Sequence, residues 1–164
     1  MFRNHEEDKG VSTRLGRWHG EGESARGFGR ARRAAFLARL KREMLRRLSG
    51  VALCCDSLRC FEEAMSTPRG LRSRPRVPGA VAVGSLVGSV GRCGSFDAGF
   101  LPVCSCSAER WKRVYAAFLE GKTLPPVELY KVGGAYFVAD GNHRVSVARF
   151  RGAVAVDAFV TEFV

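Results

Sequence analysis

Residues 127–144, VELYKVGGAYFVADGNHR, decide the fold of this chain. Two β-rich runs flank Gly133-Gly134, and a two-glycine connection predicts a hairpin because both positions readily adopt positive φ. The second strand then leads through another glycine into a helix. A glycine between a strand and a helix N-terminus is typical of a phosphate site, since free backbone N–H groups and the helix dipole attract an anion.

Five consecutive residues at this turn carry the chemistry that we assign to the site: Asp140, Gly141, Asn142, His143 and Arg144. Arg144 is expected to grip phosphate, because a guanidinium can bind two oxygens at once. Asn142 offers a donor and an acceptor, and His143 offers a donor or a proton shuttle with an unperturbed pKa near 6.5. Asp140 would hold magnesium or orient His143. The alternative is a simple helix cap.

The flanking sequence predicts a compact α+β domain with a small mixed sheet over residues 80–164. A short strand is expected at 80–83, and a helix capped by Ser107 at 107–119 with aromatic residues in its buried stripe. The last strand is expected at 154–163. Residues 86–92 are rich in glycine and predict a loop, from which Arg92 could reach an anion.

This order of elements, with LPP at 124–126, the glycine hairpin and DGNHR at 140–144, resembles the N-terminal domain of ParB-type proteins. Sulfiredoxin and a ParB-like free serine kinase share that fold. The resemblance covers residues 78–164 and implies that Gly141 and Arg144 belong to the turn that binds nucleotide phosphates. His143 matches the sulfiredoxin version of the turn. Asn142 stands where sulfiredoxin has its catalytic cysteine, which argues against sulfinic-acid repair.

The resemblance implies a nucleotide-dependent switch or adaptor that binds ATP or CTP, with or without Mg²⁺, and that acts on nucleic acid. One alternative is an enzyme of the same fold, a small-molecule kinase, an ATPase or a nuclease, in which Asp140 and His143 would be catalytic. Another is an inactive domain used for protein contacts. The DNA-reading helix-turn-helix of ParB does not follow the last strand, which argues against specific DNA partitioning.

The net charge of +11 is concentrated in the first half of the chain. Residues 1–80 hold 18 Lys and Arg against 9 Asp and Glu, whereas residues 81–164 hold 9 against 7. Such an imbalance favours a negatively charged partner: non-specific nucleic acid first and anionic lipid second. The expected nucleic-acid contacts are five arginines of a helix predicted over residues 30–48: Arg32, Arg33, Arg39, Arg42 and Arg46.

Apolar residues recur on this helix at three- and four-residue steps: Phe36, Leu37, Leu40, Met44, Leu45 and Leu48. This stripe could dock on the domain, leave its arginines to nucleic acid, or lie on an anionic membrane. Residues 1–29 mix glycine with charge and predict a disordered tail. Residues 30–66 then form a basic helical extension, and the proline-rich residues 67–79 predict a linker.

The six cysteines lack the paired spacing of a zinc site, so no metal site is predicted for them. Because no secretory signal opens the sequence, we expect free thiols and a cytoplasmic protein rather than a disulfide framework. The sequence contains no run of 18 apolar residues, so no membrane span is predicted.

Overall fold

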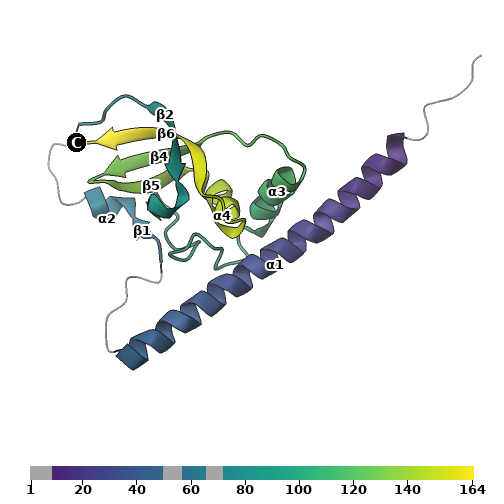
Figure 1. The fold of residues 1–164 in the computed structure, drawn as a ribbon, viewed down its shortest axis with the longest axis horizontal. Helices are drawn as coiled ribbons and strands as arrows, with labels where there is room; N and C mark the ends of the chain where they lie inside the picture. The colour runs from purple at the N-terminus through teal and green to yellow at the C-terminus, as the bar shows by residue number, and fades with distance from the viewer. Residues whose placement is uncertain (1–8, 50–56, 66–71) are drawn as a thin grey trace, which may run out of the picture.

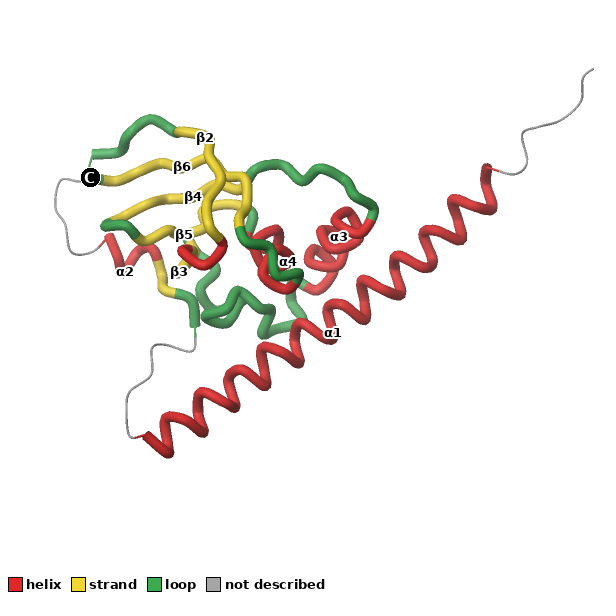
Figure 2. The backbone as a smooth tube through the Cα atoms, viewed as in Figure 1, coloured by secondary structure: helices red, strands yellow, loops and turns green. Residues whose placement is uncertain are grey.

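The computed structural model describes residues 9–49, 57–65 and 72–164 (Figure 1). A long helix crosses one side of a domain built from a sheet and shorter helices (Figure 2). In chain order the elements are α1 (Lys9–Ser49), β1 (Arg59–Cys60), α2 (Phe61–Met65), β2 (Val77–Ala82), the 3-10 turn η1 (Val83–Ser85), β3 (Leu86–Ser89), α3 (Ala108–Leu119), β4 (Val127–Val132), β5 (Ala135–Asp140), α4 (Asn142–Phe150) and β6 (Ala155–Phe163).

The six strands form one mixed sheet in the order β1-β3-β5-β4-β6-β2. Strands β3 and β5 are parallel, as are β4 and β6, whereas β4 and β5 form the antiparallel hairpin. Gly133 and Gly134 join the hairpin with φ of 54° and 82°, as the sequence predicted. The expected class, helices on a mixed sheet, is therefore confirmed.

The two faces of the sheet are covered by different helices, because neighbouring strand residues point to opposite sides. Leu129 and Val138 belong to a buried cluster that includes Val145 of α4. The next residues along β4 and β5, Tyr130 and Phe137, point the other way. There the ring of Phe61 on α2 lies 5.1 Å and 5.6 Å from theirs.

A layer of helices extends outward from α4. Trp111 of α3 is fully buried and donates a hydrogen bond from its indole nitrogen to Ser146 Oγ of α4, at 2.9 Å. Phe28 of α1 completes this second core, with its ring centroid 5.6 Å from that of Trp111. The core position predicted for the aromatic stripe of α3 is thus confirmed at Trp111 and Tyr115, both fully buried.

Helix α1 begins at Lys9, so the disordered tail predicted for residues 1–29 is wrong from residue 9 onward; residues 1–8 lie outside the described ranges. The prediction took the glycines near residue 27 as helix breakers. A Cβ on Gly27 would lie 2.6 Å from Tyr115 Cε1, so glycine is needed here for close packing of α1 on α3. Burial of Phe28, Ala31 and Ala35 offsets the weak helix propensity of this segment.

The apolar stripe predicted on residues 36–48 does not dock on the domain. Its side chains are all exposed: Phe36, Leu37, Leu40, Met44, Leu45 and Leu48. A different face of α1, made of small residues and Phe28, forms the contact with α3. Of the alternatives left open by the sequence, docking of this stripe on the domain is therefore overturned.

The start of the sheet domain also differs from the prediction. Residues 72–79, expected as a linker, run beside β6: the Arg72 amide donates to the Val164 carbonyl and the Arg74 amide to the Glu162 carbonyl, each at 2.8 Å. β2 begins within this range, at Val77. The glycine-rich residues expected as a loop form β3, where Gly88 admits the Arg59 backbone because a Cβ would lie in contact with its carbonyl oxygen.

Two disulfides replace the free thiols that the sequence predicted. Cys60 pairs with Cys93, because the parallel pairing of β1 with β3 brings the two chain segments together. Cys104 pairs with Cys106 just before α3. Cys54 and Cys55 lie outside the described residues. Proteins with structural disulfides are typical of oxidising compartments, so the cytoplasmic location stays a prediction without support from the cysteines.

Candidate functional site

Gly141 positions the turn between β5 and α4. It adopts φ of 97°, a left-handed conformation that favours glycine. A Cβ at this position would lie 2.7 Å from Val127 Cγ1 and 3.0 Å from Arg144 Nε, so the turn is also too tightly packed for a side chain. Among the residues that the structure describes, no side chain caps the helix that follows. The first backbone N–H groups of α4 are therefore left for an external acceptor.

A cleft of about 490 Å³ opens at this helix N-terminus. All five residues predicted at the site line it. Three other segments complete its walls: the loop after β3, helix α3 and the segment before β4. Their lining residues are Val90, Arg92, Arg110, Val114, Leu124 and Pro125.

The parallel pairing of β3 with β5 explains why these segments converge. The carboxyl ends of parallel strands meet at the same edge of a sheet, and ligands bind there in many α/β proteins. Ser89 ends β3 beside Val138 of β5, and its Oγ donates to Asn142 Oδ1 at 2.7 Å. Asn142 is buried and fastens α4 to β3, which places the next loop, with Arg92, on the cleft.

His143 is the most unusual side chain of the cleft. It is 6% exposed, and neither ring nitrogen has a hydrogen-bond partner within the described part of the chain. Burial, together with the positive charges of Arg110 and Arg92, lowers its pKa from 6.5 to about 4, and burial has the largest effect. The imidazole is therefore neutral at pH 7. A buried polar group without a partner is costly, so this position calls for a ligand that supplies one.

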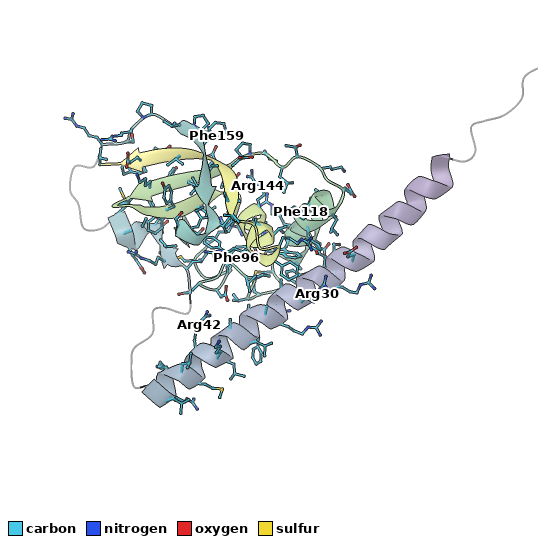
Figure 3. The ribbon with its side chains drawn as sticks, in the orientation of Figure 1. Arg30, Arg42, Phe96, Phe118, Arg144 and Phe159 are labelled. Atoms are coloured by element: carbon cyan, nitrogen blue, oxygen red, sulfur yellow. A yellow bond between two sulfur atoms is a disulfide. The ribbon has the colours of Figure 1, made fainter. Side chains whose placement is uncertain are left out.

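Asp140 and Arg144 form an ion pair instead of the contacts predicted for them. Arg144 Nη2 donates to Asp140 Oδ2 at 2.6 Å, and Nη1 donates to the carbonyl oxygens of Pro125 and Pro126. The sequence suggested that Asp140 could orient His143, but the carboxylate contacts Arg144 instead. Arg144 holds the turn against the segment before β4, with its guanidinium on the wall of the cleft (Figure 3).

Two arginines from segments distant in sequence also line the cleft. Arg92 lies in the loop after β3, where a contact with an anion was expected, and Arg110 lies on the first turn of α3. Both side chains line the cleft, and neither forms an ion pair within the described ranges. Sequence reasoning missed Arg110, because it was read as an ordinary polar residue of a helix. Its role depends on the packing of α3 against α4, which no local pattern indicates.

The cleft offers a magnesium ion one carboxylate, and that carboxylate is already paired. Magnesium bound with nucleotide phosphates is commonly held by one or two carboxylates. Asp140 is the single carboxylate among the residues that line the cleft, and Arg144 already neutralises it. In the described ranges, no three His, Cys, Asp or Glu side chains gather as a metal site. Arginine would therefore have to supply the positive charge for phosphate here.

The arginines predicted to contact nucleic acid lie far from this cleft, on α1. Arg42 approaches Asp97 at 3.7 Å, and Arg46 pairs with Glu43 at 2.8 Å. Figure 3 labels Arg42 on the side of α1 that faces the loop of Phe96. Arg32, Arg33 and Arg39 are exposed. Nucleic-acid contact through these five residues stays a prediction.

No protein-family model matches this chain, and neither the curated proteins nor the solved structures give a significant match to it. The resemblance to ParB-type proteins and sulfiredoxin therefore stays a prediction from the sequence. The function has to be argued from the cleft itself.

Proposed function

We propose that this chain binds the phosphate groups of a nucleotide, ATP or CTP, in the cleft at the N-terminus of α4, and that it acts as a nucleotide-dependent switch or adaptor. The observation that carries the proposal is the convergence of Arg92, Arg110 and the unpartnered His143 on uncapped helix amides. Each of these groups can donate a hydrogen bond to a bound anion. The nucleotide, and the ParB-like role as a switch, rest on the sequence resemblance.

The electrostatics of the cleft favour an anion of high charge. Arg92 and Arg110 both line the cleft, and the positive charge of each opposes protonation of His143. A phosphate in the cleft compensates these positive charges and accepts charge-assisted hydrogen bonds, each of which contributes about 1.5–3 kcal/mol. Such an anion would also favour the protonated imidazole. Binding should therefore take up protons, and the contribution of His143 should strengthen as the pH falls toward its free-protein pKa of about 4.

The arrangement supports a binding role over an enzymatic one. An enzyme of this fold would use Asp140 and His143 as its catalytic pair. Asp140 instead pairs with Arg144, and no group in the described part of the chain orients His143 as a base. Phosphoryl transfer also commonly relies on magnesium, and the one carboxylate that lines the cleft is paired with Arg144. We therefore expect slow nucleotide turnover or none.

Calorimetry with ATP, CTP, GTP and inorganic tripolyphosphate, with and without magnesium, tests the proposal. We expect binding without magnesium and a loss of about 10- to 100-fold in affinity for Arg110→Ala, since one charge-assisted contact is removed. Arg113→Ala is the matched control, an exposed arginine three residues further along α3 that does not line the cleft. Equal losses in both variants would show a general effect of charge and would contradict the proposed site.

A second measurement separates switch from enzyme. Nucleotide consumption by the purified protein is followed by chromatography, with Asp140→Asn and His143→Ala as variants. A switch predicts that these changes alter affinity alone. Rapid consumption that both variants abolish, with binding retained, would instead show that the two residues act on the transition state.

A further inference from the structure

Helix α1 exposes an apolar stripe to solvent, although Phe36 at its edge also lines a cavity with Phe96 and Val103 of the domain. We define the α1 stripe as Phe36, Leu37, Leu40, Met44 and Leu48, whose exposed fractions run from 47% to 81%. Monomeric proteins rarely leave several large apolar side chains together in water, and such patches mark interaction sites. The stripe lies on the C-terminal part of α1, which continues past α3 toward the side of the domain that carries β1 and α2 (Figure 1).

The stripe and the docked face of α1 lie on opposite sides of the helix. Successive residues of an α-helix turn by about 100°, so the stripe occupies a sector of roughly 120° around Leu40 and Met44. Phe28, Ala31 and Ala35, which are buried, lie on the other side by the same geometry. The helix therefore packs on the domain through one face and exposes the α1 stripe on the other. Such a two-faced helix can bind a partner without leaving the domain.

The charge around the stripe decides which partner fits. Residues 30–48 contain eight Lys and Arg and one acidic residue, Glu43. Lys41 and Arg47 lie at the edge and within the stripe by helical spacing, and Arg33 lies just before it. A second copy of α1 packed on the stripe would bring two strongly positive helices together. Nucleic acid would satisfy the cations but leave the apolar side chains in water. An anionic bilayer surface satisfies both.

We propose that the α1 stripe binds the surface of an anionic lipid bilayer. The helix lies in the plane of the interface, with Phe36, Leu40 and Met44 among the upper acyl chains. Lys41 extends along this apolar surface toward the lipid phosphates, and Arg47, which pairs with Glu43 at 3.0 Å in the free protein, exchanges that ion pair for them. None of the described helices combines the length and apolar content needed to cross a bilayer, so the contact is peripheral. This inference is independent of the phosphate-binding cleft.

Vesicle flotation of the full chain tests the proposal. Vesicles contain phosphatidylcholine alone or with about one-third phosphatidylglycerol. We expect binding to the anionic vesicles that is at least about tenfold stronger than to the neutral ones and that weakens with salt. The variant Leu37→Gln/Leu40→Gln/Met44→Gln should lose about tenfold or more, because it removes apolar contact area while glutamine preserves helix propensity.

A control variant places the same change outside the stripe. Val77→Gln/Val154→Gln/Val164→Gln replaces three exposed side chains of the sheet domain, and we expect its vesicle binding to stay within about twofold of the parent. Circular dichroism checks that α1 is retained. If the triple variant loses helix, the single change Leu37→Gln, at a side chain 60% exposed, takes its place.

The other occupants of the stripe appear as distinct outcomes. Retention of the parent on random-sequence DNA but not on anionic vesicles would overturn the proposal in favour of nucleic acid. A dimer seen by light scattering, which the stripe variant converts to monomer, with no vesicle binding, would overturn it in favour of a second copy. Equal vesicle binding by the stripe and control variants would also overturn it.

Discussion

The β4–β5–α4 segment and helix α1 differ in what fixes their structure. In the first, each local signal agrees with the final fold: two glycines make the hairpin turn, and Gly141 starts the helix with φ of 97°. In α1 the local signals conflict with the fold, since the segment around Gly27 and Gly29 is a poor helix former. There, packing against Tyr115 and Trp111 of α3 decides the outcome.

This difference teaches where glycine acts through its backbone and where it acts through its size. Gly141 needs both a positive φ and an absent side chain. Gly27 has helical geometry and needs only the absent side chain, because Tyr115 lies against it. Substitutions at these two positions can therefore separate backbone conformation from tertiary packing as the source of stability. A second glycine serves as the control for each: Gly133 for Gly141 and Gly29 for Gly27.

Gly141→Ala should have the largest effect on stability. The new Cβ meets both left-handed strain and the side chain of Val127, which together cost about 3 kcal/mol. Urea unfolding measures the loss. Gly133→Asn is the control, because position 133 also has positive φ but open space, and asparagine is favoured there in a hairpin turn. A loss at position 133 as large as that at 141 would contradict this explanation.

Gly27→Ala should destabilise the protein by about 2 kcal/mol, because its Cβ would force apart α1 and the buried ring of Tyr115. Gly29→Ala should instead stabilise it by about 0.5–1 kcal/mol, since its Cβ meets no atom within 4 Å and alanine is the better helix former. Thermal unfolding of both variants distinguishes the two cases. If both stabilise the protein, α1 does not pack on α3 as described.

Arg144→Ala should cost about 1–2 kcal/mol, because two backbone carbonyls, those of Pro125 and Pro126, lose their donor. Asp140→Ala should cost less than about 1 kcal/mol, because the side chain of Asp140 is mostly exposed and solvent screens the pair. Chemical unfolding of the two variants and the double variant measures their coupling. A larger loss for Asp140→Ala than for Arg144→Ala would show that the ion pair, not the carbonyl contacts, holds the turn.

The smallest expected effect is the contribution of His143 to the pH dependence of stability near neutrality. Its pKa is about 4 in the folded chain and 6.5 when unfolded, so the unfolded state takes up its proton first as the pH falls. Stability is thus lost as the pH falls from about 6.5 toward 4, by less than about 1 kcal/mol between pH 7 and 6. His143→Gln should lower this slope in urea unfolding at several pH values. An unchanged slope would place the responsible group elsewhere.

The sequence predicted the site best where neighbouring residues build it. The hairpin, the turn at Gly141 and the start of α4 all follow from residues close in sequence, and the five residues predicted at the turn all line one cleft. The pairing within that cleft could not be predicted. Whether Arg144 faces a ligand or Asp140 depends on how the two side chains lie across the turn from β5 to α4, and opposite charge alone does not decide between the two partners.

The remaining features depend on contacts between distant segments. Arg110 reaches the cleft because Trp111 locks α3 onto Ser146 of α4. Cys60 and Cys93 meet because β1 pairs with β3, and β3 itself was predicted as a loop from its glycines. In each case the sequence shows the residue but not its partner.

Nuclear magnetic resonance of the His143 ring tests the central claim, phosphate binding at the N-terminus of α4, most directly. The ring nitrogens are titrated with pH, with and without tripolyphosphate, and assigned by comparison with His143→Gln. We predict that the ligand shifts the ring signals and the amides of residues 142–144 and raises the His143 pKa above its value of about 4. Ligand binding by calorimetry that leaves these signals and this pKa unchanged would contradict the account.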